Sequence, residues 1–102
     1  MEFVAGVDGG GTKTECMLMD LDGNPIRTSM FGSLNMNSRP QEETAQSIRG
    51  VVESVLAQGG ECRMLCVGCA GLSNPEVRCA LERMIRAEGY GGPYMLAGDQ
   101  DA

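Results

Sequence analysis

Residues 4–23 constrain the fold of this chain more than any other stretch. An apolar run ends there on a carboxylate, Asp8, and three consecutive glycines separate it from a second apolar run. Two apolar runs joined by a glycine-rich turn are typical of antiparallel β-strands that form a hairpin. We therefore expect strands at residues 3–7 and 14–21, with both faces of the second strand well covered by the rest of the fold.

The glycine turn is suited to binding phosphate. Glycine lets the backbone approach an anion closely and adopt positive φ, so that successive N–H groups point into one concavity. Thr12 and Thr14 add hydroxyl donors, and Lys13, the only lysine of the chain, adds a positive charge. Asp8 at the end of the first strand is placed to ligate a Mg²⁺ ion that the phosphates carry. The predicted phosphate-binding residues are Gly9, Gly10, Gly11, Thr12 and Lys13.

Two better-known glycine motifs do not fit this turn. A P-loop has a lysine after its second glycine and a helix after that, whereas this chain has Thr12 followed by a strand pattern. A dinucleotide-binding fingerprint that began at Gly9 would need a third glycine where this chain has Thr14. A hairpin turn without a ligand remains the alternative, although a turn alone needs only one or two such residues.

The composition limits the classes of partner. With 102 residues the chain is long enough for one small domain, residues 1–102. A net charge of −6 argues against nucleic acids and anionic membrane surfaces as partners. The chain shows no apolar run near the length of a membrane span and no signal-peptide pattern, so we expect a cytoplasmic protein. Five cysteines without any histidine indicate free buried thiols rather than a metal site.

The rest of the chain alternates between strand and helix patterns. We expect strands at residues 26–31, 64–69 and 94–97, a helix at residues 40–58 and a second helix between Ser73 and Gly89. Pro40 lies in the first turn of the first helix, whose buried face extends to Leu56. The continuous apolar run at residues 64–69 is typical of a strand covered on both faces. Ser73 and Glu76 form a capping box for the second helix.

The resulting order is β-β-β-α-β-α-β, an α/β fold with a mixed sheet. The first three strands form an antiparallel meander, and each strand–helix–strand unit makes a parallel, right-handed crossover. This order is similar to the ribonuclease-H-like arrangement. Ligands of such sheets bind beyond the carboxyl ends of the parallel strands. Here those ends are Asp8, residues 69–71 and residues 98–99, which we expect at one edge of the sheet.

The hairpin also carries a resemblance to a known group of proteins. Asp8 to Thr14 reads Asp-Gly-Gly-Gly-Thr-Lys-Thr and resembles the phosphate-1 motif of the actin/hexokinase/Hsp70 superfamily. Within it, the whole chain resembles the branch that holds N-acetylglucosamine kinases and the BadF/BadG/BcrA/BcrD ATPases. The resemblance implies ATP and Mg²⁺ as cofactors. It also implies two similar lobes that close on ATP, of which residues 1–102 would be the first, an actin-like ATPase lobe.

The resemblance also implies roles for single residues. Asp99 would be the catalytic base that accepts the proton of the attacking sugar hydroxyl. The family usually has Asp-Ala at this place, and because this chain reads Asp-Gln-Asp-Ala, Asp101 remains the alternative. Asn35, in a Gly-x-x-Asn element, would contact the sugar, and Gly71 would let substrate pass close to the backbone. A packing role for Gly71 is equally open.

The leading functional hypothesis is an ATP-dependent kinase of an amino sugar such as N-acetylglucosamine. One alternative is an ATPase that activates a 2-hydroxyacyl-CoA dehydratase or a benzoyl-CoA reductase, and another is a lobe without catalytic function. The expected partners are the sugar, ATP and a C-terminal lobe of the same protein, with a homodimer as a further possibility. A single lobe cannot close around both substrates, so we expect little or no kinase activity from residues 1–102 alone.

Overall fold

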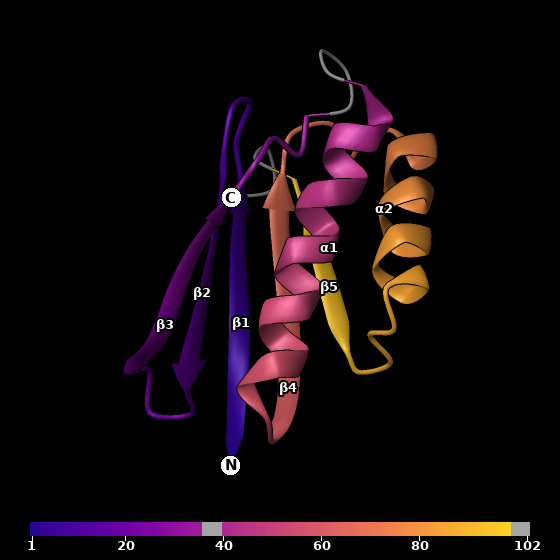
Figure 1. Ribbon diagram of the computed structural model, residues 1–102. Coiled ribbons are helices and arrows are strands. Elements are labelled where there is room, and N and C mark those ends of the chain that lie inside the picture. Colours follow the sequence, from indigo (N-terminus) through magenta and orange to yellow (C-terminus); the bar gives the residue numbers. More distant parts are fainter. Residues whose placement is uncertain (36–39, 99–102) are drawn as a thin grey trace.

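The computed structural model of the protein describes residues 1–35 and 40–98 (Figure 1). The elements in chain order are β1 (Glu2–Gly9), β2 (Thr14–Asp20), β3 (Pro25–Phe31), α1 (Gln41–Gln58), β4 (Glu61–Cys69), α2 (Pro75–Ala87) and β5 (Tyr94–Ala97). The predicted order β-β-β-α-β-α-β is therefore confirmed, with bounds within three residues of those expected from the sequence.

The five strands form one mixed sheet in the order β3-β2-β1-β4-β5. β2 pairs antiparallel with both β1 and β3, as the predicted meander requires. β4 pairs parallel with β1 and with β5, so both crossovers are present. β1 is consequently the central strand, between the antiparallel and the parallel parts of the sheet.

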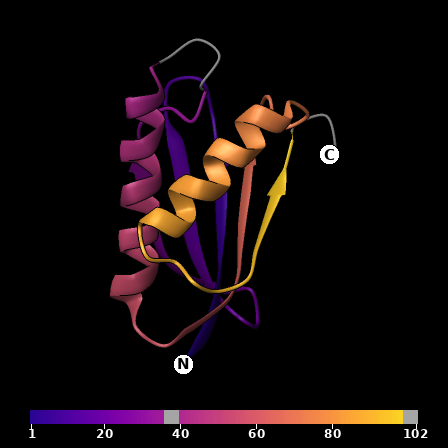
Figure 2. The same ribbon diagram turned by 90° about the vertical axis from the view of Figure 1, so that its right-hand side faces the viewer.

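Both helices lie on the same side of this sheet (Figures 1 and 2). We call this side of the sheet the covered face. Its core joins strand side chains to one face of each helix, and the fully buried members include Phe3, Leu18, Leu65, Ile48, Val51, Val52, Leu81 and Ile85. Among the described residues, neither helix is long and apolar enough to cross a membrane.

The opposite side, which we call the open face, corrects two predictions. β4 was expected to be covered on both faces, but Cys66 in its middle is exposed. Met17 and Met19 of β2 are only partly buried, so the second strand is also covered on one face rather than two. The reason is that two successive right-handed crossovers in the same direction place both helices on the same side of the sheet.

The start and the buried face of α1 each differ from the prediction by one residue. Pro40 occupies the N-cap position, one residue before the helix, instead of the first turn. Ser47 is buried, and its hydroxyl donor lies within reach of two carbonyl oxygens, that of Ser33 at 3.0 Å and that of Glu43 at 3.1 Å. Leu56, expected on the buried face, is 55% exposed, so the apolar contact of α1 ends one residue earlier, at Val55.

The N-terminus of α2 is capped one residue later than predicted. The Oδ1 atom of Asn74 accepts a hydrogen bond from the backbone N–H of Glu76 at 2.9 Å, and Pro75 is the first helical residue. The capping box that began at Ser73 is therefore wrong. Asn and Ser are similarly good N-caps, so the choice depends on which residue has extended backbone just before the proline.

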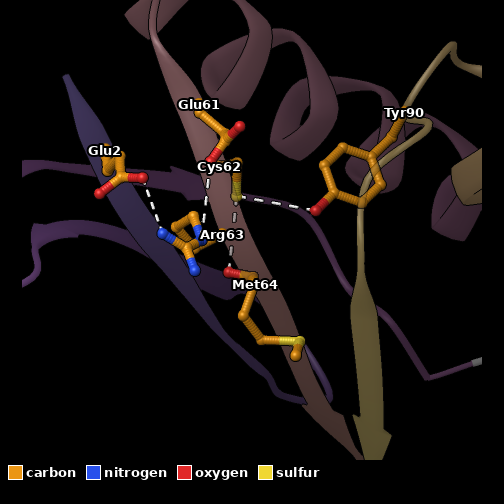
Figure 3. Close-up of polar contacts among 6 residues, drawn as sticks. All are labelled: Glu2, Glu61, Cys62, Arg63, Met64 and Tyr90. Atoms are coloured by element: carbon orange, nitrogen blue, oxygen red, sulfur yellow. Dashed lines mark hydrogen bonds and ion pairs between the residues drawn. The ribbon is translucent and has the colours of Figure 1, made fainter.

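The amino edge of the parallel strands is closed by side-chain contacts (Figure 3). The guanidinium of Arg63 lies between two carboxylates, 2.7 Å from Glu2 and 3.6 Å from Glu61. The hydroxyl of Tyr90 donates to the carbonyl oxygen of Pro93, in the loop before β5, and its oxygen lies 3.7 Å from the Cys62 sulfur. Burial is the main reason that the pKa of Tyr90 lies well above its usual value. These contacts join β1, β4 and the loop before β5 at the amino edge.

Candidate functional site

The carboxyl ends of β1, β4 and β5 lie at one edge of the sheet, because the three strands are parallel neighbours. The hairpin that joins β1 to β2 projects from this edge (Figure 1). The loop before α1 lies against the hairpin, since the backbone N–H of Leu34 donates to the carbonyl oxygen of Gly10 at 3.4 Å. The edge therefore gathers the predicted phosphate-binding turn and the predicted sugar-binding loop.

The hairpin turn is held in place by its own backbone and by the loop before α1. The N–H of Gly10 donates to the carbonyl oxygen of Lys13 at 2.9 Å and closes the turn. Thr14 is fully buried, and its hydroxyl donates to the carbonyl oxygen of Gly32 at 2.7 Å. The expectation that Thr14 offers its hydroxyl to a phosphate is therefore wrong, because that donor is used within the fold.

The glycines of the turn act differently from the prediction. The described residues with positive φ are Gly23, Gly59, Gly60, Gly71 and Gly89, so the turn glycines do not adopt the positive φ that was expected of them. A Cβ atom on Gly9 would lie 2.5 Å from Leu34 Cδ1, and one on Gly10 would lie 2.9 Å from the carbonyl oxygen of Lys13. Packing therefore excludes side chains at Gly9 and Gly10. Gly11 has open space around it.

The tip of the hairpin is nevertheless able to receive an anion. Within the described part of the chain, the backbone N–H groups of Gly11 and Thr12 have no hydrogen-bond partner. Both residues are exposed, as is Lys13. A hollow of about 370 Å³ lies beside them, with Asp8, Gly10, Thr12, Lys13, Glu15 and Met30 in its lining. Two N–H donors and one ammonium at an open hollow are suited to phosphate oxygens.

The carboxylate of Asp8 fits the predicted metal role only in part. Asp8 is exposed and lies opposite Glu15 in the register of β1 and β2. Residues 1–35 and 40–98 contain no group of three or more side chains that could hold a metal ion together. A Mg²⁺ ion at Asp8 would therefore take most of its six oxygens from water and phosphate, which is its usual habit in nucleotide sites.

The other predicted site residues have mixed outcomes. Asn35 is half-buried in the loop that contacts the hairpin, and its backbone N–H donates to the Ser33 hydroxyl at 2.9 Å. Gly71 has φ of 88° in the turn between β4 and α2, so its backbone conformation alone favours glycine. Asp99 and Asp101 lie outside the described residues. β5 ends at Ala97, at the same edge as Asp8.

The structure adds residues that sequence reasoning missed. Ser33 and Leu34 both contact the Gly10 carbonyl oxygen, with the Ser33 hydroxyl donating at 3.4 Å. No periodicity or motif in a short polar loop indicates such a contact. Glu15 lines the hollow opposite Asp8, and this position was predictable, because a hairpin closed at residues 10 and 13 pairs residue 8 with residue 15.

Comparison with known proteins shows which family the chain matches and which proteins it is similar to. Residues 5–99 match the BadF/BadG/BcrA/BcrD ATPase family. Over 105 residues the chain is 32% identical to the N-acetylmuramic acid/N-acetylglucosamine kinase of Clostridium acetobutylicum. The aligned region covers 99% of this chain and 34% of that kinase. The chain therefore spans about a third of the length of this curated relative.

Solved structures share the fold. The ROK hexokinase of Thermus thermophilus superposes with a TM-score of 0.68 at 20% identity, over 95% of this chain and 34% of the hexokinase. RNase H1 of Halobacterium salinarum superposes with a TM-score of 0.55 at 11% identity, over 96% of this chain and 85% of that enzyme. These likenesses confirm the predicted ribonuclease-H-like fold. With residues 5–99 matched, the chain belongs to the BadF/BadG/BcrA/BcrD ATPase family.

Proposed function

We propose that this chain is the phosphate-binding lobe of a kinase that transfers the γ-phosphoryl group of ATP to a hydroxyl of an amino sugar of the N-acetylglucosamine type. The observation that carries the proposal is the hairpin tip, where exposed N–H donors and Lys13 lie beside Asp8 at the carboxyl edge of the sheet. The 32% identity to a kinase of N-acetylmuramic acid and N-acetylglucosamine supports the choice of substrate class.

The hairpin would bind and orient the phosphates of ATP. The N–H groups of Gly11 and Thr12 would donate to phosphate oxygens, and the Lys13 ammonium would neutralise part of their charge. Asp8 would hold Mg²⁺ through water, and the bound metal would supply charge neutralisation for phosphoryl transfer. Because the Gly10 carbonyl oxygen is tied to the loop before α1, the tip is held in place before ATP binds.

The acceptor sugar would lie at the same edge. Asn35 would hydrogen-bond to the sugar, since its loop contacts the hairpin through Gly10. Asp99 follows β5 at this edge in the sequence, and we propose it as the base that accepts the proton of the attacking hydroxyl. The second lobe would complete the adenine site and exclude water, so that residues 1–102 alone have little or no kinase activity.

The test is ATP consumption by the full-length protein with and without N-acetylglucosamine. We expect sugar-dependent turnover that falls about 10²- to 10⁴-fold in Asp99→Asn, the usual effect of losing a general base. Asp8→Asn should raise the Mg²⁺ concentration that half-maximal turnover requires. Asp22→Asn is the matched control, because Asp22 is an exposed aspartate in the β2–β3 turn, at the opposite edge of the sheet.

Each other outcome changes the proposal in a defined way. ATP hydrolysis that is indifferent to the sugar would favour the activator-type ATPase. Sugar-dependent turnover that survives Asp99→Asn but is lost in Asp101→Asn would move the base to Asp101. The absence of ATP consumption by the full-length protein under all these conditions would refute the kinase and leave a lobe used for binding.

A further inference from the structure

The loop that joins α2 to β5 is rich in glycine and is nevertheless held by side chains. It comprises residues 88–93, which include Gly89, Gly91 and Gly92, and it runs along the amino edge of the sheet (Figure 2). Glycine has more conformational freedom to lose on folding than any other residue. A Cβ atom on Gly91 would meet nothing within 4 Å, so packing does not restrain the loop there. Contacts from other residues therefore decide how firmly the loop is held.

Arg86, in the last turn of α2, makes these contacts. Its Nη1 atom donates to the carbonyl oxygen of Tyr90 at 2.9 Å and to that of Gly92 at 3.0 Å. An arginine near the end of a helix commonly caps the last carbonyl groups of that helix. Here both acceptors lie beyond Ala87, the last residue of α2. Arg86 therefore fastens the loop that leads into β5.

The same arginine also contacts the first residue of β5. Its guanidinium lies over the ring of Tyr94, 4.5 Å from the centroid. The hydroxyl of Tyr94 donates to the carboxylate of Glu82 at 2.6 Å, and hydrogen bonds to a charged acceptor are stronger than those between neutral groups. Glu82 and Arg86 are neighbours on the surface of α2, one turn apart. We call Glu82, Arg86 and Tyr94 the β5 clamp.

β5 itself is a weakly held element. It has four residues, of whose side chains Leu96 alone is buried. It lies at the end of the sheet order, so it is hydrogen-bonded to β4 and to no other described strand. Short, exposed elements open more readily than central strands. The clamp fastens this strand at Tyr94, about 10 Å of extended chain from its carboxyl end at Ala97.

The position of β5 matters because Asp99 follows it. Asp99 comes two residues after Ala97 in the sequence and is the base of the proposed function. A general base acts only within hydrogen-bond reach of the proton that it accepts. A misplacement of about 1 Å can lower the rate of an enzyme by about 100-fold. A displaced β5 would therefore slow phosphoryl transfer and leave the phosphate-binding hairpin intact.

We propose that Arg86 is a positioning residue for phosphoryl transfer, which through the β5 clamp holds in place the strand that leads to the catalytic base. This inference rests on the proposed function, because it takes Asp99 as the base. Arg86 lies beside the amino edge of the sheet, where it binds Tyr90 and Gly92, whereas Asp8 and the hairpin lie at the carboxyl edge. It therefore acts through β5 and makes no contact with substrate.

The first test measures kcat and KM of the full-length protein with ATP and N-acetylglucosamine. Arg86→Met keeps an unbranched side chain but removes the donors and the charge. We expect it to lower kcat about 10- to 100-fold and to leave KM for both substrates within about twofold. Tyr94→Phe keeps the ring and should lower kcat less. Arg83→Met is the matched control, since Arg83 is an exposed arginine on the same helix, and it should change neither constant.

A double-mutant cycle with Asp99→Asn separates positioning from a merely structural role. An arginine that acts through the base has nothing to position once the base is removed. Arg86→Met should therefore change the kcat of the Asp99→Asn protein by less than about twofold. An equal loss of kcat in both backgrounds overturns the proposal, as does a higher KM or an equal kcat for Arg86→Met and Arg83→Met. If Asp101 is the base, the cycle with Asp101→Asn gives the same result in its place.

Hydrogen exchange of the full-length protein keeps this inference separate from the proposed function, because it does not depend on turnover. The protected amides of β5 should exchange at least about tenfold faster in Arg86→Met than in Arg83→Met, since the clamp no longer opposes local opening. Unchanged exchange in an active kinase contradicts this inference alone. Faster exchange in a protein that consumes no ATP contradicts the kinase and limits Arg86 to anchoring β5.

Discussion

The two faces of the sheet have different compositions although the same strands form both. On the covered face β4 presents Leu65 and Val67, which are 0% and 1% exposed. On the open face the same strand presents Met64 and Cys66, of which Cys66 is exposed. Successive residues of a strand point to opposite sides, so neighbours in the sequence belong to different environments. Packing among residues 1–35 and 40–98 therefore stabilises one face, and the same residues leave the other face largely uncovered.

The glycines of β1 show the same contrast. Gly9 lies on the covered face, where Leu34 fills the space that a side chain would need. Gly6 lies on the open face, where no described atom comes within 4 Å of the position of a Cβ. One glycine is explained by the fold of this chain and the other is not. Substitutions at paired positions of the two faces can therefore test how separate their roles are.

The largest expected difference is between Leu65→Ala and Met64→Ala in this chain. Leu65 is fully buried against the helices, so its truncation should lower the free energy of unfolding by about 2–5 kcal/mol. Met64 is partly exposed on the open face, so Met64→Ala should lower the free energy of unfolding by less than about 1 kcal/mol. Urea denaturation followed by circular dichroism measures both. Equal losses would show that the open face is packed as tightly as the covered one.

The second difference is in thiol reactivity. Burial raises the pKa of Cys16, on the covered face, from 9.0 to about 11. A shift of this size lowers the thiolate fraction near pH 8 about 100-fold, and only the thiolate reacts. In the isolated chain we expect iodoacetamide to modify the exposed Cys66 quickly and Cys16 at least 100-fold more slowly.

The same shift makes stability depend on pH. The pKa of Cys16 is higher in the folded state than in the unfolded state. Its contribution to the free energy of unfolding is therefore complete below pH 9.0 and is lost as the pH rises towards 11. The free energy of unfolding of Cys16→Ala should therefore fall less than that of the unchanged chain across this interval. A parallel loss in both proteins would assign the alkaline instability to other groups.

The third difference is between Gly9→Ala and Gly6→Ala. A Cβ on Gly9 would lie 2.5 Å from Leu34 Cδ1, so the loop before α1 must shift, at a cost of about 1–3 kcal/mol. Gly6→Ala adds a side chain in open space and should stabilise the isolated chain by about 0.4–1 kcal/mol by restricting the unfolded state. Thermal unfolding of the two variants gives the comparison. Destabilisation by Gly6→Ala would mean that the space beside Gly6 is already filled in the isolated chain.

Much of the fold could be predicted from the sequence because the signals were local. Glycines and prolines marked the ends of the elements, and the change from strand to helix periodicity gave their order. The hairpin with Asp8 and Lys13 was predicted for the same reason, since its chemistry lies within seven consecutive residues. The roles proposed for these residues in binding ATP and Mg²⁺ stay predictions.

What could not be predicted depends on contacts between distant residues. Leu34 fills the space that a side chain at position 9 would need, so this position requires glycine. The hydroxyl of Thr14 donates to the carbonyl oxygen of Gly32, which is 18 residues away. Cys66 is exposed because both helices pack against the other side of the sheet. The sequence of a single segment does not show on which side the helices pack. A continuous apolar run such as residues 64–69 predicts a strand with two covered faces. The pattern is the same whether residues of this chain or another segment cover the second face.

The smallest expected effect concerns the helix cap that sequence and structure assign to different residues. α2 is one of the two helices on the covered face, and the Asn74 side chain accepts the N–H of Glu76. Asn74→Ala should therefore lower the free energy of unfolding by about 1 kcal/mol. Ser73→Ala should change it by no more than about 0.5 kcal/mol, because Ser73 is exposed and precedes the cap. The reverse ranking in urea denaturation would restore the capping box at Ser73 and move the start of α2 by one residue.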